Sequence, residues 1–185
     1  MLQTVEDMQR VLDEADCLCT QAQVEAAITQ MASAISERLA QRNPLILCVM
    51  NGGLILCGQL LTRLPFPLQA SYIHATRYRQ ETTGGILDWK VRPDMPLKGR
   101  TILIVDDILD EGTTLAAIVD YCSAQGAEAV LTAVLVDKQH DRKARPDLKG
   151  DFTGLYVEDR FLFGYGMDYK GYWRNASGIY AVKGL

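Results

Sequence analysis

The sequence predicts an α/β domain built on a parallel sheet with helices on both faces. Three apolar runs of strand length, at residues 45–50, 101–105 and 129–136, alternate with stretches of helical periodicity. Continuous apolar runs are typical of strands buried on both faces, and strand–helix alternation favours parallel pairing. Because 185 residues suffice for one sizeable core, we expect a single domain over residues 1–185.

The composition narrows the possible functions. Hydrophobic residues make up 48% and charged residues 23%, which is close to the globular average and argues against wholesale disorder. The formal net charge of −4 argues against a nucleic-acid partner, because phosphate contacts need concentrated Lys and Arg. An anionic substrate must therefore be held by local groups rather than by net charge.

Cysteine usage and hydropathy indicate a cytoplasmic protein without membrane contact. The five cysteines are odd in number, form no Cys-x-x-Cys pair and lie mostly in apolar runs, which favours reduced thiols over disulfides or zinc. The chain opens with an acidic amphipathic stretch, so no signal peptide is expected. Residues 45–61 are almost uncharged, but they are interrupted by Asn51-Gly52-Gly53 and are shorter than the ~20 residues of a spanning helix.

The first half of the chain opens with a predicted helix. Thr20 and Gln23 indicate a capping box, and apolar residues at helical spacing continue through residue 42, before Asn43-Pro44. The later elements in this half are a strand at 45–50, a helix at 53–64 ended by Pro65, and a strand at 68–78.

The second half continues the alternation and then changes character. Residues 80–90 are polar and contain Gly84-Gly85, which indicates a mobile loop or an exposed hairpin. The tail from Phe152 is aromatic and glycine-rich, so we expect a core of about 20–150 and a base-binding cap largely from 152–185. The other elements are a connection at 93–99, a strand at 101–105, a helix at 113–125 closed by Gly126, and a strand at 129–136.

Residues 105–115 carry the most informative pattern. Asp106 and Asp107 follow a buried strand, and adjacent carboxylates oppose each other's ionisation unless hydroxyl donors or a cation stabilise them. A vicinal diol offers two such donors. The following Glu111-Gly112-Thr113-Thr114 places N–H groups and hydroxyls at a helix N-terminus, which suits a phosphate. The two features predict a ribose 5-phosphate site, whereas a simple helix cap is the alternative; the Walker pattern of nucleoside triphosphatases is absent.

This segment resembles the phosphoribosyl pyrophosphate motif of type I phosphoribosyltransferases. Three further matches follow in order and point to the hypoxanthine-guanine branch: Val136-Asp137-Lys138, residues 161–169 and Tyr172-Trp173-Arg174. The resemblance covers nearly the whole chain. It implies purine salvage by transfer of a 5-phosphoribosyl group from phosphoribosyl pyrophosphate to hypoxanthine or guanine, with Mg2+ as cofactor. It also implies a homodimer or homotetramer.

The resemblance assigns roles around phosphoribosyl pyrophosphate. Asp106 and Asp107 would hold the ribose hydroxyls and, with Asp168, the magnesium ion. Asp110 would be the general base at N7 of the purine while N9 attacks C1′, and a helix cap is the alternative. The remaining contacts to phosphoribosyl pyrophosphate would come from Asn51, Gly52, Glu111, Gly112, Thr113, Thr114 and Arg174.

The expected purine site comprises Lys138, Phe161, Leu162 and Asp168. Lys138 would contact the 6-oxo group, although a plain surface lysine is the alternative, and residues 139–143 have the composition of solvated surface. Phe161 would stack on the purine or pack in the core. The Leu162 backbone would contact the N1 and 2-position edge. A salt bridge between Asp168 and Arg174 is the alternative to magnesium and pyrophosphate contacts.

Two loops complete the expected site. Asn51-Gly52 lies where the family places a tight loop against pyrophosphate, and glycine permits the close approach. Asn51 stands where the family often has Lys, so a cationic contact is lost. Arg77 and Tyr78 match the family's lid, with Arg77 in the place of Ser. The two histidines, His74 and His140, have no ligand spacing and no assigned role.

Two alternatives stay open. The first is another enzyme of the same fold that uses xanthine, adenine, orotate or uracil. Lys138 and residues 161–168 argue against adenine and pyrimidines, whereas xanthine shares the 6-oxo group. The second is a non-catalytic regulator that keeps the phosphoribosyl pyrophosphate site and binds RNA or DNA, against which the negative net charge and Asp110 argue.

Overall fold

Two buried aliphatic strands form the centre of the computed structural model, which describes residues 3–77, 87–146 and 148–184. β2 (Leu45–Val49) and β5 (Thr101–Leu109) pair in parallel. On β5, Leu103 and Val105 enter the hydrophobic core on one side of the sheet, and Ile102 and Ile104 enter the core on the other side. Burial on both faces is what a continuous apolar run predicts, so both strand predictions are confirmed.

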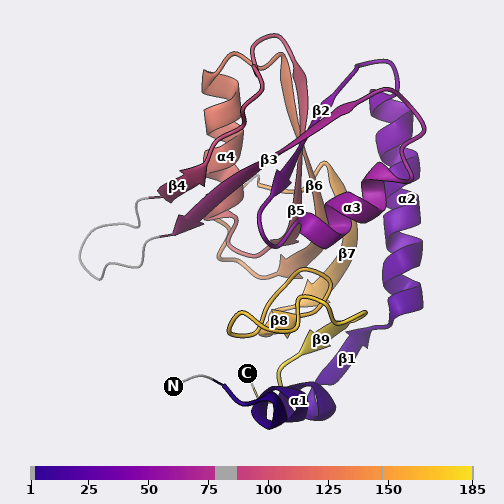
Figure 1. Ribbon diagram of the computed structural model, residues 1–185, viewed down its shortest axis with the longest axis vertical. Coiled ribbons are helices and arrows are strands. Elements are labelled where there is room, and N and C mark those ends of the chain that lie inside the picture. Colours follow the sequence, from indigo (N-terminus) through magenta and orange to yellow (C-terminus); the bar gives the residue numbers. More distant parts are fainter. Residues whose placement is uncertain (1–2, 78–86, 147, 185) are drawn as a thin grey trace.

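The sheet extends in both directions from this centre (Figure 1). β3 (Gln69–Arg77) lies beside β2, and β6 (Ala129–Gln139) and β7 (Phe152–Glu158) lie beyond β5, all in parallel. β4 (Leu87–Val91) pairs antiparallel with β3 at the edge, which agrees with a hairpin in this region. The strand order is β4-β3-β2-β5-β6-β7.

Helices cover both faces of the sheet, which confirms the predicted fold class (Figure 1). α2 (Gln21–Leu39) and α3 (Leu54–Leu61) lie on one face, and α4 (Thr113–Ala124) lies on the other. α2 begins with the predicted capping box, in which the Thr20 N–H donates to Gln23 Oε1 at 2.8 Å. α2 ends at Leu39 and α3 ends at Leu61, each three residues before its predicted end. In both cases a turn separates the helix from the proline that follows it.

A second, three-stranded sheet lies at one end of the molecule, beside α1 (Val5–Glu14) and both termini (Figure 1). It consists of β1 (Asp16–Cys19), β9 (Ile179–Ala181) and β8 (Leu162–Phe163), paired antiparallel in that order. The Trp173 indole N–H donates to the Met8 carbonyl at 2.7 Å and ties α1 to this end. β1 was not predicted, because four residues with two cysteines give no strand pattern.

The expectation that the chain from Phe152 onward forms a cap is wrong for residues 152–158. These residues form β7 in the main sheet, parallel to β6. β7 is an edge strand with few buried side chains, so it lacks the apolar run of the central strands. β5 continues to Leu109, beyond its predicted end, because it still pairs with β6, and β6 continues to Gln139 because its last residues pair with β7.

The cysteines are free thiols, as expected from their number and spacing. Cys48, Cys57 and Cys122 are buried, and burial raises the pKa of Cys122 to about 11, so this thiol stays protonated near neutral pH. Within the described parts of the chain, no helix combines the length and apolar character needed to cross a membrane.

We expect Gly154→Ala to lower the free energy of unfolding by about 1–3 kcal/mol, because overpacking strains a filled core. A Cβ at Gly154 would lie 2.8 Å from the Leu135 carbonyl oxygen and 2.9 Å from Met31 Sδ. Gly58→Ala in α3 is the matched control, since a Cβ there meets no described atom within 4 Å. Urea-induced unfolding measures both, and equal stability of the two variants would contradict this packing.

Candidate active site

The carboxyl ends of the parallel strands meet at one edge of the sheet, where α/β proteins commonly bind ligands. The loops that follow β2 and β5 line a cavity of about 620 Å³ there, together with Arg174 from residues 159–184, which we call the cap segment. The lining brings together these predicted residues: Asn51, Gly52, Asp106, Asp107, Asp110, Glu111, Gly112, Thr113, Thr114 and Arg174. His74, to which no role was assigned, also lines this cavity.

A second cavity of about 200 Å³ adjoins the first. Its walls include the four predicted purine-site residues: Lys138, Phe161, Leu162 and Asp168. Asp107, Ile108 and Asp110 line both cavities, so the end of β5 forms their common wall. Any two ligands that filled both cavities would meet beside these three residues.

Asp106 and Asp107 are adjacent acids at this wall. The Asp107 N–H donates to Asp106 Oδ1 at 2.9 Å. Burial and the neighbouring Asp107 carboxylate raise the pKa of Asp106 well above its usual value, and burial also raises the pKa of Asp107. The ionised forms of these two carboxylates are disfavoured in the free protein. A hard cation, or hydroxyl groups that donate hydrogen bonds to them, would stabilise these forms.

The N-terminus of α4 opens onto the larger cavity. Gly112 is the N-cap residue with a φ of 78°, and no described side chain caps the helix. A Cβ at Gly112 would collide with Leu148, so both the backbone conformation and the packing require glycine. Thr113 and Thr114 line the cavity at this helix N-terminus, a position that suits a phosphate.

The loop after β2 packs tightly against β5 and the cap segment. A Cβ at Gly52 would collide with the Asp107 carboxylate, and a Cβ at Gly166 would collide with the Gly52 carbonyl oxygen. These close approaches bring the backbone beside Asn51 to the cavity wall. The loop therefore lies where its backbone can contact a ligand in the cavity.

Asp168 and Arg174 form the salt bridge that was the alternative interpretation of this pair. Arg174 Nη2 lies 2.5 Å from Asp168 Oδ1, and Nη1 donates to the Gly166 carbonyl at 2.6 Å. Arg174 lines the larger cavity and Asp168 lines the smaller one. The salt bridge therefore lies between the two ligand spaces and leaves both residues accessible from them.

Lys138 and Phe161 face the smaller cavity in different environments. The Lys138 side chain is 9% exposed, so the plain surface lysine is excluded. Phe161 is 45% exposed and makes an edge contact with Tyr169, with ring centroids 5.7 Å apart. An exposed aromatic ring on a cavity wall is available for stacking, unlike a core phenylalanine.

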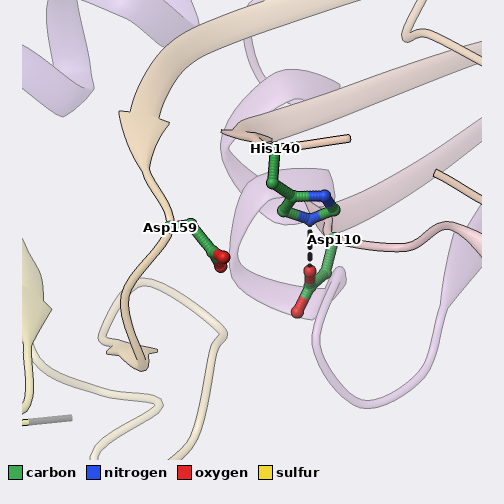
Figure 2. A group of neighbouring side chains, drawn as sticks. All are labelled: Asp110, His140 and Asp159. Atoms are coloured by element: carbon green, nitrogen blue, oxygen red, sulfur yellow. Dashed lines mark hydrogen bonds and ion pairs between the residues drawn. The ribbon is translucent and has the colours of Figure 1, made fainter. Parts of the chain in front are cut away.

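Asp110 receives two hydrogen bonds, one from the end of β6 and one from the residue directly after it. Lys138 Nζ donates to Oδ2 at 3.1 Å, and His140 Nε2 lies 2.7 Å from Oδ1 (Figure 2). Partial burial raises the pKa of Asp110, but the hydrogen bonds from His140 and Lys138 outweigh this effect and lower the pKa below its usual value. The carboxylate is therefore ionised and oriented near neutral pH.

Lys143 clamps the turn after β5 to the end of β6. Its Nζ lies 2.8 Å from the Leu109 carbonyl, 2.9 Å from the Asp110 carbonyl, 3.0 Å from the Lys138 carbonyl and 2.7 Å from Asp137 Oδ1. The Asp137 side chain is 8% exposed. A buried carboxylate needs a paired cation, and Lys143 supplies that charge.

The expectation that residues 139–143 are solvated surface is therefore wrong for His140 and Lys143. Both contact the turn that carries Asp110. Their polar side chains look like surface in sequence because their partners lie about 30 residues away. One signal was present: Asp137 directly follows the buried apolar run of residues 129–136, and a carboxylate there needs a nearby cation.

The predicted lid lies largely outside the described residues. Tyr78 is not among them, and Arg77 is described as the last residue of β3 without its side chain.

Comparisons with known proteins identify a family to which this chain is similar over most of its length. The model of a family described as the phosphoribosyl transferase domain matches residues 16–170. A hypoxanthine-guanine-xanthine phosphoribosyltransferase from Tritrichomonas foetus is 28% identical over 179 residues, which cover 97% of this chain and 94% of that protein.

Two bacterial proteins are similar over comparable lengths. A hypoxanthine-guanine phosphoribosyltransferase from Bacillus subtilis is 29% identical over 167 residues, covering 90% of this chain and 92% of that protein. The crystal structure of a hypoxanthine-guanine phosphoribosyltransferase from Bacillus anthracis superimposes with a TM-score of 0.82 at 25% identity, covering 90% of this chain and 96% of that one.

We expect Lys143→Met to lower the free energy of unfolding by about 3–5 kcal/mol, because it leaves the buried Asp137 carboxylate without a cation. Urea-induced unfolding followed by circular dichroism measures the change. Lys149→Met removes an exposed lysine and is the matched control, with an expected change within about 0.5 kcal/mol. A loss no larger for Lys143 than for Lys149 would show that the clamp contributes nothing to stability.

Proposed function

This chain belongs to the phosphoribosyltransferase family, and we propose that it transfers the 5-phosphoribosyl group from phosphoribosyl pyrophosphate to hypoxanthine or guanine. The products are IMP or GMP and pyrophosphate, which makes this a purine salvage reaction. The proposal is carried by the junction of the two cavities at Asp107, Ile108 and Asp110. A sugar phosphate in the larger cavity and a base in the smaller one have their reacting atoms at this junction.

The larger cavity suits phosphoribosyl pyrophosphate. Asp106 and Asp107 accept hydrogen bonds from the ribose hydroxyls, which stabilises carboxylates whose pKa values are raised in the free protein. The turn from Glu111 through Gly112 and the first residues of α4 binds the 5-phosphate. The amides beside Asn51 and Gly52, with the Arg174 guanidinium, contact the pyrophosphate.

The smaller cavity suits a 6-oxopurine. The exposed Phe161 ring stacks on the base, and the Leu162 backbone contacts its N1 and 2-position edge. Lys138 donates to the 6-oxo group, which disfavours adenine because its 6-amino group is itself a donor. Asp168 closes this cavity beside Arg174.

Asp110 is the proposed general base. As N9 of the base forms its bond to C1′, the bond from C1′ to the pyrophosphate oxygen breaks and the proton on N7 passes to the Asp110 carboxylate. Mg2+, held by Asp106, Asp107 and Asp168 directly or through water, would neutralise charge on the leaving pyrophosphate. The protein aligns the two substrates and excludes water, which limits hydrolysis.

Several parts of the proposal rest on the family resemblance. The resemblance implies that Arg77 and Tyr78 would form a lid over the reaction centre. The chain acts as a homodimer or homotetramer, which light scattering after size-exclusion chromatography determines. The five free thiols fit a reducing compartment, so we place the protein in the cytoplasm.

Xanthine is a second candidate base. A relative with 28% identity is named for hypoxanthine, guanine and xanthine, and xanthine shares the 6-oxo group that Lys138 contacts. A nucleic-acid regulator has less support, because acidic residues outnumber basic ones by 23 to 19.

The decisive experiment supplies phosphoribosyl pyrophosphate, Mg2+ and one free base at a time, and identifies nucleotide products by chromatography. We expect IMP from hypoxanthine and GMP from guanine, and XMP only if xanthine is also a substrate. Adenine and orotate should give no product, because a donor at Lys138 selects a 6-oxo acceptor. Turnover of adenine or orotate in the absence of IMP and GMP would overturn the assignment.

We expect Asp110→Asn to lower kcat by about 10²–10⁴-fold, because it removes the proton acceptor. Affinity for phosphoribosyl pyrophosphate, measured by calorimetry with Mg2+, should stay near that of the parent protein. Asp13→Asn, at an exposed position in α1, controls for the loss of a negative charge. Equal losses in turnover and affinity at Asp110 would refute the base role.

A further inference from the structure

His140 lies directly after β6, and its ring points at the carboxylate of Asp110 (Figure 2). Nε2 lies 2.7 Å from Asp110 Oδ1, and the histidine side chain is 4% exposed. The proposed function uses Asp110 as the base but gives His140 no task. A buried ring in contact with the reacting carboxylate therefore requires an explanation.

The hydrogen bonds around His140 define which ring nitrogen carries the proton. The backbone N–H of Arg142 donates to Nδ1 at 3.0 Å. Nδ1 must therefore offer a lone pair, which leaves the proton on Nε2. Nε2 then donates this proton to Asp110 Oδ1, so His140 is a neutral donor to the carboxylate.

A metal site is the other arrangement that these side chains suggest. One ligand atom each from Asp110, His140 and Asp159 lies within 4.8 Å of the others. However, Lys138 Nζ lies 3.1 Å from Asp110 Oδ2 and 3.1 Å from Asp159 Oδ1, so a cation already bridges the two carboxylates. A protonated Nε2 also has no lone pair for a metal. The group is therefore a hydrogen-bond network.

The two donors to Asp110 differ in how firmly they are held. Lys138 is shared with Asp159, and in the proposed function it turns to the 6-oxo group when a base binds. His140 is fixed from behind by the Arg142 N–H and is almost completely buried. Departure of Lys138 frees Oδ2, whereas the contact to Oδ1 remains.

We infer that His140 is a positioning residue, which holds Oδ1 of Asp110 so that Oδ2 is presented to N7 of the bound purine. This inference rests on the proposed function, because it assigns a partner to the base named there. His140 does not touch the substrate. It acts by orienting the carboxylate that does.

The charges that face this contact balance one another. Asp110 and Asp159 are matched by Lys138 and Arg142, with Arg142 holding Asp159 through hydrogen bonds of 2.7 and 3.1 Å. Lys143, which follows His140 in the chain, donates to the backbone carbonyl of Asp110. The negative charge of Glu111 also stabilises the Arg142 cation. A neutral His140 preserves this balance, and its hydrogen bond lowers the pKa of Asp110.

Two substitutions separate the donor from the bulk of the ring. His140→Leu fills similar space without a donor, and His140→Gln keeps an N–H near the place of Nε2 but cannot titrate. We expect kcat of the Leu variant to fall at least about tenfold, since a hydrogen bond to a charged group is lost, with KM for phosphoribosyl pyrophosphate unchanged. The Gln variant should retain most of the turnover.

The pH profile of the reaction would not change if His140 had only a structural role, so it distinguishes the two roles. The hydrogen bond stabilises the ionised carboxylate, so its removal raises the pKa of Asp110. The acid limb of kcat/KM, which reports the free enzyme, should then move to higher pH in the Leu variant and stay near its original position in the Gln variant. Asp141→Asn, at an exposed neighbouring position, is the control and should behave like the parent protein.

A measurement on the unaltered protein keeps the inference testable if the Leu variant does not fold. Nitrogen-15 NMR should find the His140 proton on Nε2, and a proton on Nδ1 would overturn the inference, as would an unmoved acid limb in a folded Leu variant. Failure of the proposed function gives a different result, because the unaltered protein then forms no purine nucleotide. In that case NMR still determines whether His140 donates to Asp110.

Discussion

The parallel pairing of β5 with β2 on one side and β6 on the other is the constraint on which the site depends. The aliphatic residues of β5 are buried in both cores, so the strand cannot shift without exposing one of them. Its register continues through Leu109, which pairs with Asp137. The acids that follow the aliphatic run are therefore carried on a rigid strand, at the edge where the carboxyl ends of its neighbours also lie.

The turn beyond β5 is held by residues that follow β6. Lys143 binds the backbone of this turn and the buried Asp137, and His140 binds the side chain of Asp110. Parallel pairing makes this possible, because the two strands end side by side. In the proposed reaction, the Asp110 carboxylate that takes the proton would thus have a rigid backbone and a hydrogen bond from His140 to one oxygen, while its other oxygen faces Lys138.

Close backbone packing joins the cap segment to the main sheet. Gly52, Asp107 and Gly166 meet with no room for a Cβ at either glycine, so the loop after β2, the end of β5 and the cap segment form one wall. The pair of Asp168 and Arg174 crosses this region between the two cavities. The cap segment thereby lies between the larger and the smaller cavity and leaves them in contact at Asp110.

The sequence by itself determined the features that depend on neighbours along the chain: the apolar strands, the capping box of α2, and the acidic turn leading into α4. Local pattern suffices for these because burial on both faces and helix capping involve residues a few positions apart. The tertiary structure decided the role of β7 in the main sheet, the pairing of β1 with β9, and the contacts of His140 and Lys143. These depend on partners far along the chain, and a polar side chain that finds a buried partner has the same composition as one that faces water.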